Sequence, residues 1–349
     1  MTVGSGIRFL RVGDRRVAYA TTGTGPPLVV PAWWISHLEL DWDDPAYRAL
    51  WEAVAEGYTL VRYDRLGVGM SDREVRAEDL SLDAEVALLR ALLDELAFDT
   101  VNLIGGSSGG CAAIAFAARF PERVGRLLLV GAYADGPSIT APDVRAALVA
   151  TVRSHWGLGS RMLADLFLGD ADGAAQERLA RYQRAAASPE TAAVLLELVY
   201  TNCVRGELEH VRAPTTVVHR RGDRAIPYAL GRELAAGIPN ASLIPLEGTA
   251  HFAWAGDVDS VVRALRSVLA PTAAPAPARA GGEPAAVLLS RREREVLALV
   301  ANGLSDQEIA DQLVLSRHTV HRHVANIRNK LGRGSRAAAV AEAARLGLL

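Results

Sequence analysis

Lysine is almost missing from this chain of 349 residues, because Lys330 is the only lysine among its 38 basic residues. A P-loop nucleotide site needs its Gly-Lys-Ser/Thr sequence, and a pyridoxal enzyme needs a lysine for its Schiff base. A phosphoacceptor receiver domain normally uses a lysine near its aspartate. None of these three sites can therefore be built from residues 1–329.

Cysteines and long apolar runs are scarce as well. Cys111 and Cys203 are the two cysteines, and their separation fits neither a disulfide framework nor a metal-ligand motif. No uninterrupted apolar stretch approaches the roughly 20 residues of a membrane-spanning helix. Residues 1–23 contain no apolar block followed by a cleavage site. We therefore expect a globular cytoplasmic protein with no cofactor, no metal site and no membrane partner.

Composition and charge divide the chain into two parts. Residues 271–286 contain four prolines and little that can be buried, which is typical of a linker. Residues 287–349 hold ten basic and six acidic residues, a net charge of +4, and the −2 of the whole chain then leaves −6 for residues 1–286. The sequence predicts an acidic domain over residues 1–270 and a small basic domain, whose charge suggests a nucleic-acid partner.

Short β-branched runs alternate with helical patterns in the larger domain. Strands are expected at 16–21, 27–31, 58–64, 100–105, 126–132, 215–220 and 242–247. Residues 80–98 carry apolar side chains at helical spacing, and from about 135 to 211 every pattern is helical. This order indicates an α/β fold, with a mostly parallel sheet covered by helices and a helical insertion placed over it.

A glycine-rich turn between an expected strand and an expected helix offers a nucleophile. The letters GGSSG at 105–109 match the Gly-x-Ser-x-Gly pattern, which holds a serine on a tight and strained turn. The pattern also fits one residue later, around Ser108. Counting from the end of the apolar strand favours Ser107.

A nucleophilic serine needs a base to take its proton and a carboxylate to orient that base. His251 lies just past the last expected strand, and Asp223 lies just past the strand before it. Each candidate thus follows its own strand, at the edge where open α/β sheets place their sites. We predict a catalytic triad of Ser107, Asp223 and His251, with the alternative that Asp223 and His251 only cap their loops.

Residues 1 to about 270 resemble the α/β-hydrolase superfamily. The resemblance is carried by the serine turn, by the His251 loop, by Gly-Asp-x-x-x-Pro at 222–227 and by Asp-x-x-Gly-x-Gly-x-Ser at 64–71. It implies that Ser107 is the nucleophile and that Asp64 is structural. A serine at this turn argues against the branches that use an aspartate nucleophile, the epoxide hydrolases and haloalkane dehalogenases.

The oxyanion hole is where the sequence departs from that family. Family esterases usually show His-Gly after the strand that here runs into the letters PAWW at 31–34. Proline supplies no N–H group, so the backbone N–H groups of Trp33 and Ser108 are the candidates. Losing one well-aimed donor costs about 10²–10³ in rate, and we expect weak turnover. The tryptophans expected to line an apolar pocket under the insertion are Trp33, Trp34, Trp42 and Trp254.

Capping signals divide residues 287–349 into short helices. The helices are expected to begin after Ser290, Ser305, Ser316 and Ser335. In the third helix, over 317–331, apolar residues recur at +4, +7 and +11 from Val320 and should face inward. The outer face of that helix is then basic and able to form hydrogen bonds, which suits the major groove of DNA.

This segment resembles the LuxR-type (GerE-like) helix-turn-helix over about 63 residues. The shared features are R-E-x-E-V-L at 292–297, G-L-S at 303–305, E-I-A at 308–310, L-S-x-x-T-V-x-x-H-V at 315–324 and K-L-G at 330–332. The resemblance implies double-stranded DNA as a partner and a homodimer through the last helix. A lysine is common in the family where His321 stands. The residues expected at the DNA are Arg317, Thr319, His321, Arg322, Asn326 and Lys330.

The fusion of these two modules suggests a DNA-binding transcriptional regulator. In this hypothesis the hydrolase-like domain senses, and in one version also hydrolyses, a small apolar ester or lactone-like ligand. The ligand then changes how the C-terminal dimer engages DNA. One alternative is a serine hydrolase of the esterase type with a secondary DNA-binding tail, and another is a catalytically inactive receptor.

Overall fold

The computed structural model describes residues 6–269, 291–313, 315, 317–331 and 335–345. Contacts divide the chain into two compact units, and the larger one ends at Pro271. The linker predicted at 271–286 and the capping residues Ser290 and Ser316 lie outside the described residues. Within the described ranges, no helix is both long enough and apolar enough to cross a membrane.

The larger unit is built on one mixed sheet, with the strand order β1-β2-β4-β3-β5-β6-β7-β8 in its described residues. The hairpin of β1 and β2 is antiparallel, β2 pairs antiparallel with β4, and the remaining neighbours are parallel. The strands are β1 (Arg8–Val12), β2 (Arg15–Gly23), β3 (Pro27–Val30), β4 (Thr59–Tyr63), β5 (Val101–Gly106), β6 (Val124–Val130), β7 (Thr215–Arg220) and β8 (Ser242–Leu246). Every predicted strand is present to within two residues at each end, and β1 is an addition to the prediction.

Helices pack on this sheet and enclose a large apolar core. Helix α4 packs on β5 and β6 and against α3, helices α9 and α10 pack on β7 and β8, and α2 packs against α10. Strand residues such as Leu103, Leu128 and Val217 are fully buried between these layers. The helices are α1 (Leu38–Asp43), α2 (Pro45–Val54), α3 (Leu82–Glu95), α4 (Gly109–Arg119), α9 (Tyr228–Gly237) and α10 (Val258–Leu269), with short 3-10 turns η1 (Ala77–Leu80) and η2 (Pro121–Arg123).

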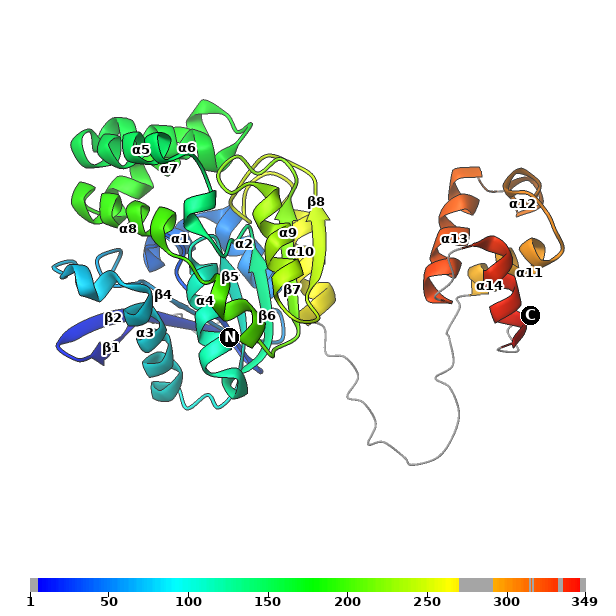
Figure 1. Cartoon of the computed structure of the whole chain (residues 1–349), viewed down its shortest axis with the longest axis horizontal. Helices are drawn as coiled ribbons and strands as arrows, with labels where there is room; N and C mark the ends of the chain where they lie inside the picture. The colour runs from blue at the N-terminus through cyan, green and yellow to red at the C-terminus, as the bar shows by residue number, and fades with distance from the viewer. Residues whose placement is uncertain (1–5, 270–290, 314, 316, 332–334, 346–349) are drawn as a thin grey trace. The chain divides into compact units, whose positions relative to one another are not determined.

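The segment between β6 and β7 forms the predicted helical insertion, here called the cap (Figure 1). Within the cap, α6 packs on α5 and α7, and α5 packs on α8. Helix α5 ends at Ser154. His155 leaves the helical conformation there, and Trp156 begins the next helix. The cap elements are η3 (Gly136–Ser138), α5 (Pro142–Ser154), α6 (Trp156–Leu168), α7 (Gly173–Ala186), α8 (Pro189–Thr201) and η4 (Arg205–His210).

The smaller unit is a bundle of short helices with a core of its own. Its helices are α11 (Arg291–Ala301), α12 (Asp306–Leu313), α13 (Arg317–Lys330) and α14 (Arg336–Arg345). The apolar residues predicted to face inward in α13, from Val320 to Leu331, are buried. Ser305 and Glu308 form the predicted capping box, and Ser335 caps α14.

Candidate active site and DNA-binding helix

Ser107 stands in the turn between β5 and α4. Its φ of 49° lies in the left-handed region, which residues other than glycine rarely adopt, so the turn is strained. The Ser107 N–H donates to the Val130 carbonyl at 3.0 Å, which fixes the turn on the neighbouring strand. A Cβ at Gly109 would lie 2.7 Å from the Ala32 carbonyl oxygen, so glycine is needed for this close approach.

His251 connects the serine to the aspartate. Its Nε2 lies 2.9 Å from Ser107 Oγ, and its Nδ1 lies 2.8 Å from Asp223 Oδ2. All three side chains are at least nine-tenths buried. With Nδ1–H donating to the carboxylate, the Nε2 lone pair faces the serine hydroxyl, which is the arrangement a general base needs. Ser108, the other candidate, has a buried hydroxyl with no hydrogen-bond partner in the described structure.

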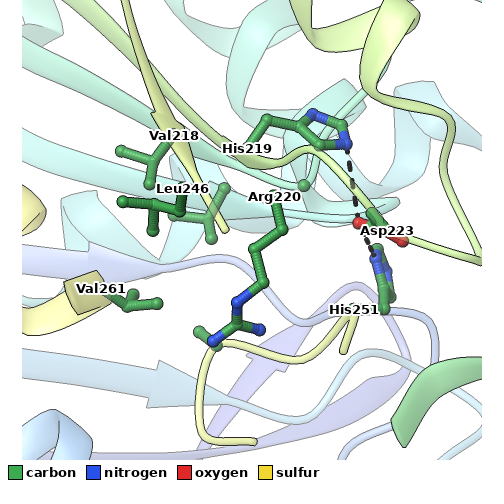
Figure 2. Close-up of a pocket in the computed structure, with 10 residues that line it drawn as sticks. Val218, His219, Arg220, Asp223, Leu246, His251 and Val261 are labelled. Atoms are coloured by element: carbon green, nitrogen blue, oxygen red, sulfur yellow. Dashed lines mark hydrogen bonds and ion pairs between the residues drawn. The ribbon is translucent and has the colours of Figure 1, made fainter. Parts of the chain in front are cut away.

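The Asp223 carboxylate lies between two histidines (Figure 2). Its other oxygen accepts the N–H groups of Ala225 and Ile226. Burial favours the protonated acid, but His251, its hydrogen bond and His219 together hold the pKa of Asp223 below its usual value. Burial also lowers the pKa of His219, whose Nε2 donates to the Ile226 carbonyl at 2.9 Å. Asp223 is therefore held in its ionised form, with a histidine on either side of its carboxylate.

Arg220, at the end of β7, holds the loop that carries His251 (Figure 2). The guanidinium is buried, and it donates to four backbone carbonyls of that loop. The acceptors are Ala250 and Phe252 at 2.8 Å, Ala255 at 2.7 Å and Asp257 at 3.2 Å. Neither His219 nor Arg220 was predicted from the sequence, because their types and positions at a strand end do not reveal which atoms they face.

Aromatic rings surround the imidazole of His251. The ring centroids of Trp33, Phe167 and Phe252 lie 6.0, 5.8 and 5.8 Å from it. Phe167 comes from the cap helix α6, and its carbonyl accepts the His251 N–H at 2.8 Å. The cap and the histidine loop are therefore joined directly, in apolar surroundings that limit the access of water.

The predicted tryptophan pocket is present only in part. Trp33, Trp34 and Trp254 line a cavity of about 30 Å³ whose wall is mostly apolar and also includes polar side chains. Trp42 instead packs over the guanidinium of Arg62, 4.0 Å from the ring centroid to the carbon of that group. Trp34 also contacts the cap, through the ring of Trp156.

The two N–H groups expected at an oxyanion hole belong to Trp33, three residues beyond β3, and to Ser108, directly before α4. A residue in front of a helix has no intrahelical acceptor for its N–H, so that of Ser108 is available.

Asp64 accepts hydrogen bonds from Ser36 Oγ and from the N–H groups of Leu38 and Met70, a structural arrangement. In the described residues no group of three or more His, Cys, Asp or Glu side chains is placed to hold a metal ion.

Helix α13 carries the residues expected at DNA. Arg317 and His321 are exposed. His321 Nδ1 lies 3.4 Å from an Asp306 carboxylate oxygen, and Arg336 binds the same carboxylate at 2.5 Å. The remaining expected contacts have side chains outside the described part of the structure, and these are Thr319, Arg322, Asn326 and Lys330.

A linked serine, histidine and aspartate at the carboxyl ends of parallel strands, under a helical cap, are the features of an α/β hydrolase fold. Residues 41–167 match the model of the alpha/beta hydrolase fold family, and residues 287–343 match the model of the bacterial regulatory proteins of the luxR family. A 2-hydroxy-6-oxononadienedioate/2-hydroxy-6-oxononatrienedioate hydrolase of Cupriavidus pinatubonensis is 32% identical over 209 residues, 57% of this chain and 72% of that protein. The chain belongs to the α/β hydrolase fold family and also carries a LuxR-type DNA-binding domain.

Two further matches concern the larger unit. A 2-hydroxy-6-oxo-6-phenylhexa-2,4-dienoate hydrolase of Burkholderia cepacia is 28% identical over 233 residues, which cover 64% of this chain and 81% of that protein. The crystal structure of an enol-lactonase from Burkholderia xenovorans superposes with a TM-score of 0.62 and 24% identity, over 75% of this chain and 99% of that one. At that level of identity, the structural match supports the fold alone.

Proposed function

We propose that this protein is a one-component transcriptional regulator, whose hydrolase domain binds and hydrolyses a small apolar ester or lactone-like ligand. The observation that carries the proposal is the hydrogen-bonded chain of Ser107, His251 and Asp223 in the same polypeptide as a LuxR-type domain. The ligand is proposed to shift the DNA-binding equilibrium, for which it must bind the two states of the protein unequally. A regulator of this kind would act in the cytoplasm, as a homodimer formed through the smaller unit.

The proposed reaction uses the three side chains in fixed roles. Ser107 Oγ attacks the ligand carbonyl while His251 Nε2 takes the hydroxyl proton, and Asp223 orients the imidazole and stabilises its charged form. The N–H groups of Trp33 and Ser108 are proposed to bind the oxyanion. His251 then returns the proton to the leaving alkoxide. A water molecule, activated by His251 in the same way, hydrolyses the acyl-serine and ends the signal.

The relatives suggest a second class of ligand. The Cupriavidus and Burkholderia cepacia proteins are named as hydrolases of oxo acids. An unsaturated keto acid is therefore a second compound to test beside esters and lactones. The alternative function is a serine hydrolase whose DNA-binding tail is secondary, and good turnover of a metabolite with no selected DNA site would favour it.

The decisive experiment for the hydrolase domain is intact-protein mass spectrometry after exposure to a fluorophosphonate. We expect one adduct on the wild-type chain and on Ser108→Ala, and none on Ser107→Ala or His251→Ala, because Ser107, unlike Ser108, is hydrogen-bonded to a histidine. Labelling that persists in Ser107→Ala would contradict the assignment of the nucleophile. A folded wild type that binds DNA but takes no label would favour an inactive receptor.

The DNA-binding domain is tested separately. We expect Arg322→Ala to abolish specific DNA binding, with labelling of Ser107 unchanged, because base contacts by arginine carry sequence discrimination. Binding by the wild type should weaken steeply as salt rises, since phosphate contacts release counterions. A matched control is Arg294→Ala, an exposed arginine on α11. Equal loss in both variants would contradict a specific role for Arg322.

A further inference from the structure

The cavity of about 30 Å³ lies where β3 ends, between α1, β4 and the cap helix α7. Its polar wall combines side chains that are far apart in the sequence. They include Trp33, Asp41, Tyr47, Arg62, Tyr182 and Gln183. The space is large enough for the carboxyl group of a ligand, or for one or two water molecules.

Arg62 is the unusual member of this wall. Its side chain is only 3% exposed, and it forms no ion pair within 4.0 Å in the described structure. Its Nε and Nη1 have no hydrogen-bond partner there. The rings of Trp42 and Tyr47 lie 4.0 and 5.8 Å from the guanidinium carbon and stabilise the cation in part. An arginine stays charged when it is buried, so its unused donors are costly.

Two residues of this wall also carry a buried polar atom that has no hydrogen-bond partner in the described structure, although Trp33 Nε1 lies beside Gly106. Trp33 Nε1 is an unused donor, and Gln183 Oε1 is an unused acceptor. The Gln183 side chain is fixed, because its Nε2 donates to the Ser160 carbonyl at 3.0 Å. Polar atoms this deeply buried are normally paired. The charge and the unused donors of Arg62 dominate this wall, so the complementary group is an acidic oxygen.

Asp41 does not fully neutralise Arg62. Burial raises the pKa of Asp41 to about 7, so this carboxyl group is partly protonated near neutral pH. Asp64, the next carboxylate, uses its oxygens for hydrogen bonds to Ser36, Leu38 and Met70. The charge of Arg62 therefore remains available to an incoming anion.

A much larger cleft of about 930 Å³ adjoins this cavity. The two spaces share Asp41, Tyr47, Leu179, Tyr182 and Trp254 in their walls. Small-molecule sites commonly have such volumes, with mostly apolar walls and a few polar groups that fix orientation. The cleft supplies the apolar wall through Leu40, Leu168 and Leu179, and the cavity supplies the charged end.

We propose that the cleft and the cavity form one effector site for a small organic acid, with the apolar body in the cleft and the carboxylate on Arg62. The inference rests on the proposed regulatory function and adds to it a second ligand, an acid that binds apart from Ser107 and is not hydrolysed there. None of the three triad residues lines either space. The ring of Trp33 lies between the two sites. It packs so closely on Gly106 that a Cβ there would overlap it, and the centroid of the Trp33 ring lies 6.0 Å from that of the His251 ring.

The test is ligand-observed NMR titration of the full-length protein with 4-phenylbutanoate and octanoate, and with the matched neutral amides. We expect saturable binding of at least one acid, and weaker binding of its amide, to both the wild type and Ser107→Ala. Arg62→Gln should weaken the acid about tenfold or more and leave the amide unchanged, because a charge-assisted bond is lost. Arg62→Lys should restore part of the affinity.

The matched control is Arg48→Gln, an exposed arginine on α2 that lines neither space, which should change little. Equal binding of acid and amide by the wild type, or no saturable binding of either acid, overturns the effector site without any variant having to fold. Labelling of Ser107 by a fluorophosphonate in that same protein would leave the hydrolase proposal standing. Acid binding that depends on Arg62 in a protein without labelling would support the site and contradict the hydrolase.

Discussion

Asp41 is a buried carboxyl group on α1 whose ionisation should appear in the stability of the protein. Burial raises its pKa from 3.8 to about 7, although a hydrogen bond from Tyr182 opposes this. Between pH 3.8 and about pH 7, Asp41 therefore keeps a proton in the folded state that it has lost in the unfolded chain. The free energy of unfolding should fall by up to about 4 kcal/mol as the pH rises from about 4 to about 7.

The variant Asp41→Asn removes this ionisation. We expect its free energy of unfolding in urea to improve relative to that of the wild type between about pH 5 and about pH 8. The control is Asp43→Asn, on the same short helix but exposed. It should leave the pH dependence of the wild type unchanged. Parallel curves for Asp41→Asn and the wild type would show that Asp41 ionises normally.

Functional residues that belong to a sequence motif could be predicted from the sequence. Residues whose role depends on their burial and their neighbours could not. The serine turn and the chain order of Asp223 and His251 pointed to side chains that the structure brings into hydrogen-bond contact. The choice between Ser107 and Ser108 needed the left-handed φ and the bond to His251. Arg62 gave no signal, because an arginine inside a strand reveals neither its burial nor its missing partners.

The loop that follows β8 depends on one side chain from a neighbouring strand. Arg220 donates four hydrogen bonds to carbonyls of this loop, and His251 stands among them. Arg220→Met keeps much of the volume and removes every donor. We expect the rate of fluorophosphonate labelling at Ser107 to fall at least about tenfold, since displacing a catalytic group by an ångström costs about 10² in rate. Mass spectrometry over time measures this rate.

The adjacent Arg221→Met is the control for that experiment. Arg221 is half exposed and pairs with the exposed Glu247 at 3.3 Å, an interaction worth little. Its labelling rate should equal that of the wild type. In Arg220→Met the labelling rate per folded molecule should fall, with the folded fraction measured by circular dichroism, and loss of folded protein alone would leave that rate unchanged. An unchanged rate in folded Arg220→Met would show that the loop holds its shape without the arginine.

Elements with a strong apolar pattern were predicted well, and an edge strand was not. In β1 only Leu10 is buried, so the run Arg8–Val12 lacks the pattern of a core strand. It pairs with β2 through a tight turn at Gly13, whose φ is 62°. A Gly-Asp pair between two runs was the available hairpin signal. The break at His155 between α5 and α6 has no proline to mark it, and the nearest glycine, Gly157, lies inside the next helix.

For the whole molecule, composition alone separated an acidic α/β part from a basic helical part. The main apolar core of the larger unit and that of the smaller unit share no residue. Motifs with fixed spacing also predict the fold of each part, because each motif depends on local turns and helix caps. How a ligand in one unit affects DNA binding by the other depends on a tertiary relation that no sequence motif encodes.

Separate cores predict that the smaller unit can unfold without the larger one. Ile309 on α12 is fully buried in the smaller core, and Ile→Ala in such a place costs about 2–5 kcal/mol, most of the stability of a domain of this size. All six tryptophans lie between residues 33 and 254, so tryptophan fluorescence reports only on the larger unit. In Ile309→Ala we expect an early thermal transition by circular dichroism and loss of DNA binding, with the fluorescence transition and Ser107 labelling unchanged.

The control for this last experiment is Gln312→Ala, an exposed residue of the same helix, which should leave both transitions and DNA binding as in the wild type. If the fluorescence transition of Ile309→Ala moves down together with the circular dichroism, the units share free energy of folding and are not independent. That outcome would also supply a route by which a ligand in the larger unit changes DNA binding. If the two transitions are independent, the effector would instead have to act through dimerisation. A ligand shifts an equilibrium only when it binds the two states unequally, and monomer and dimer would then be those states.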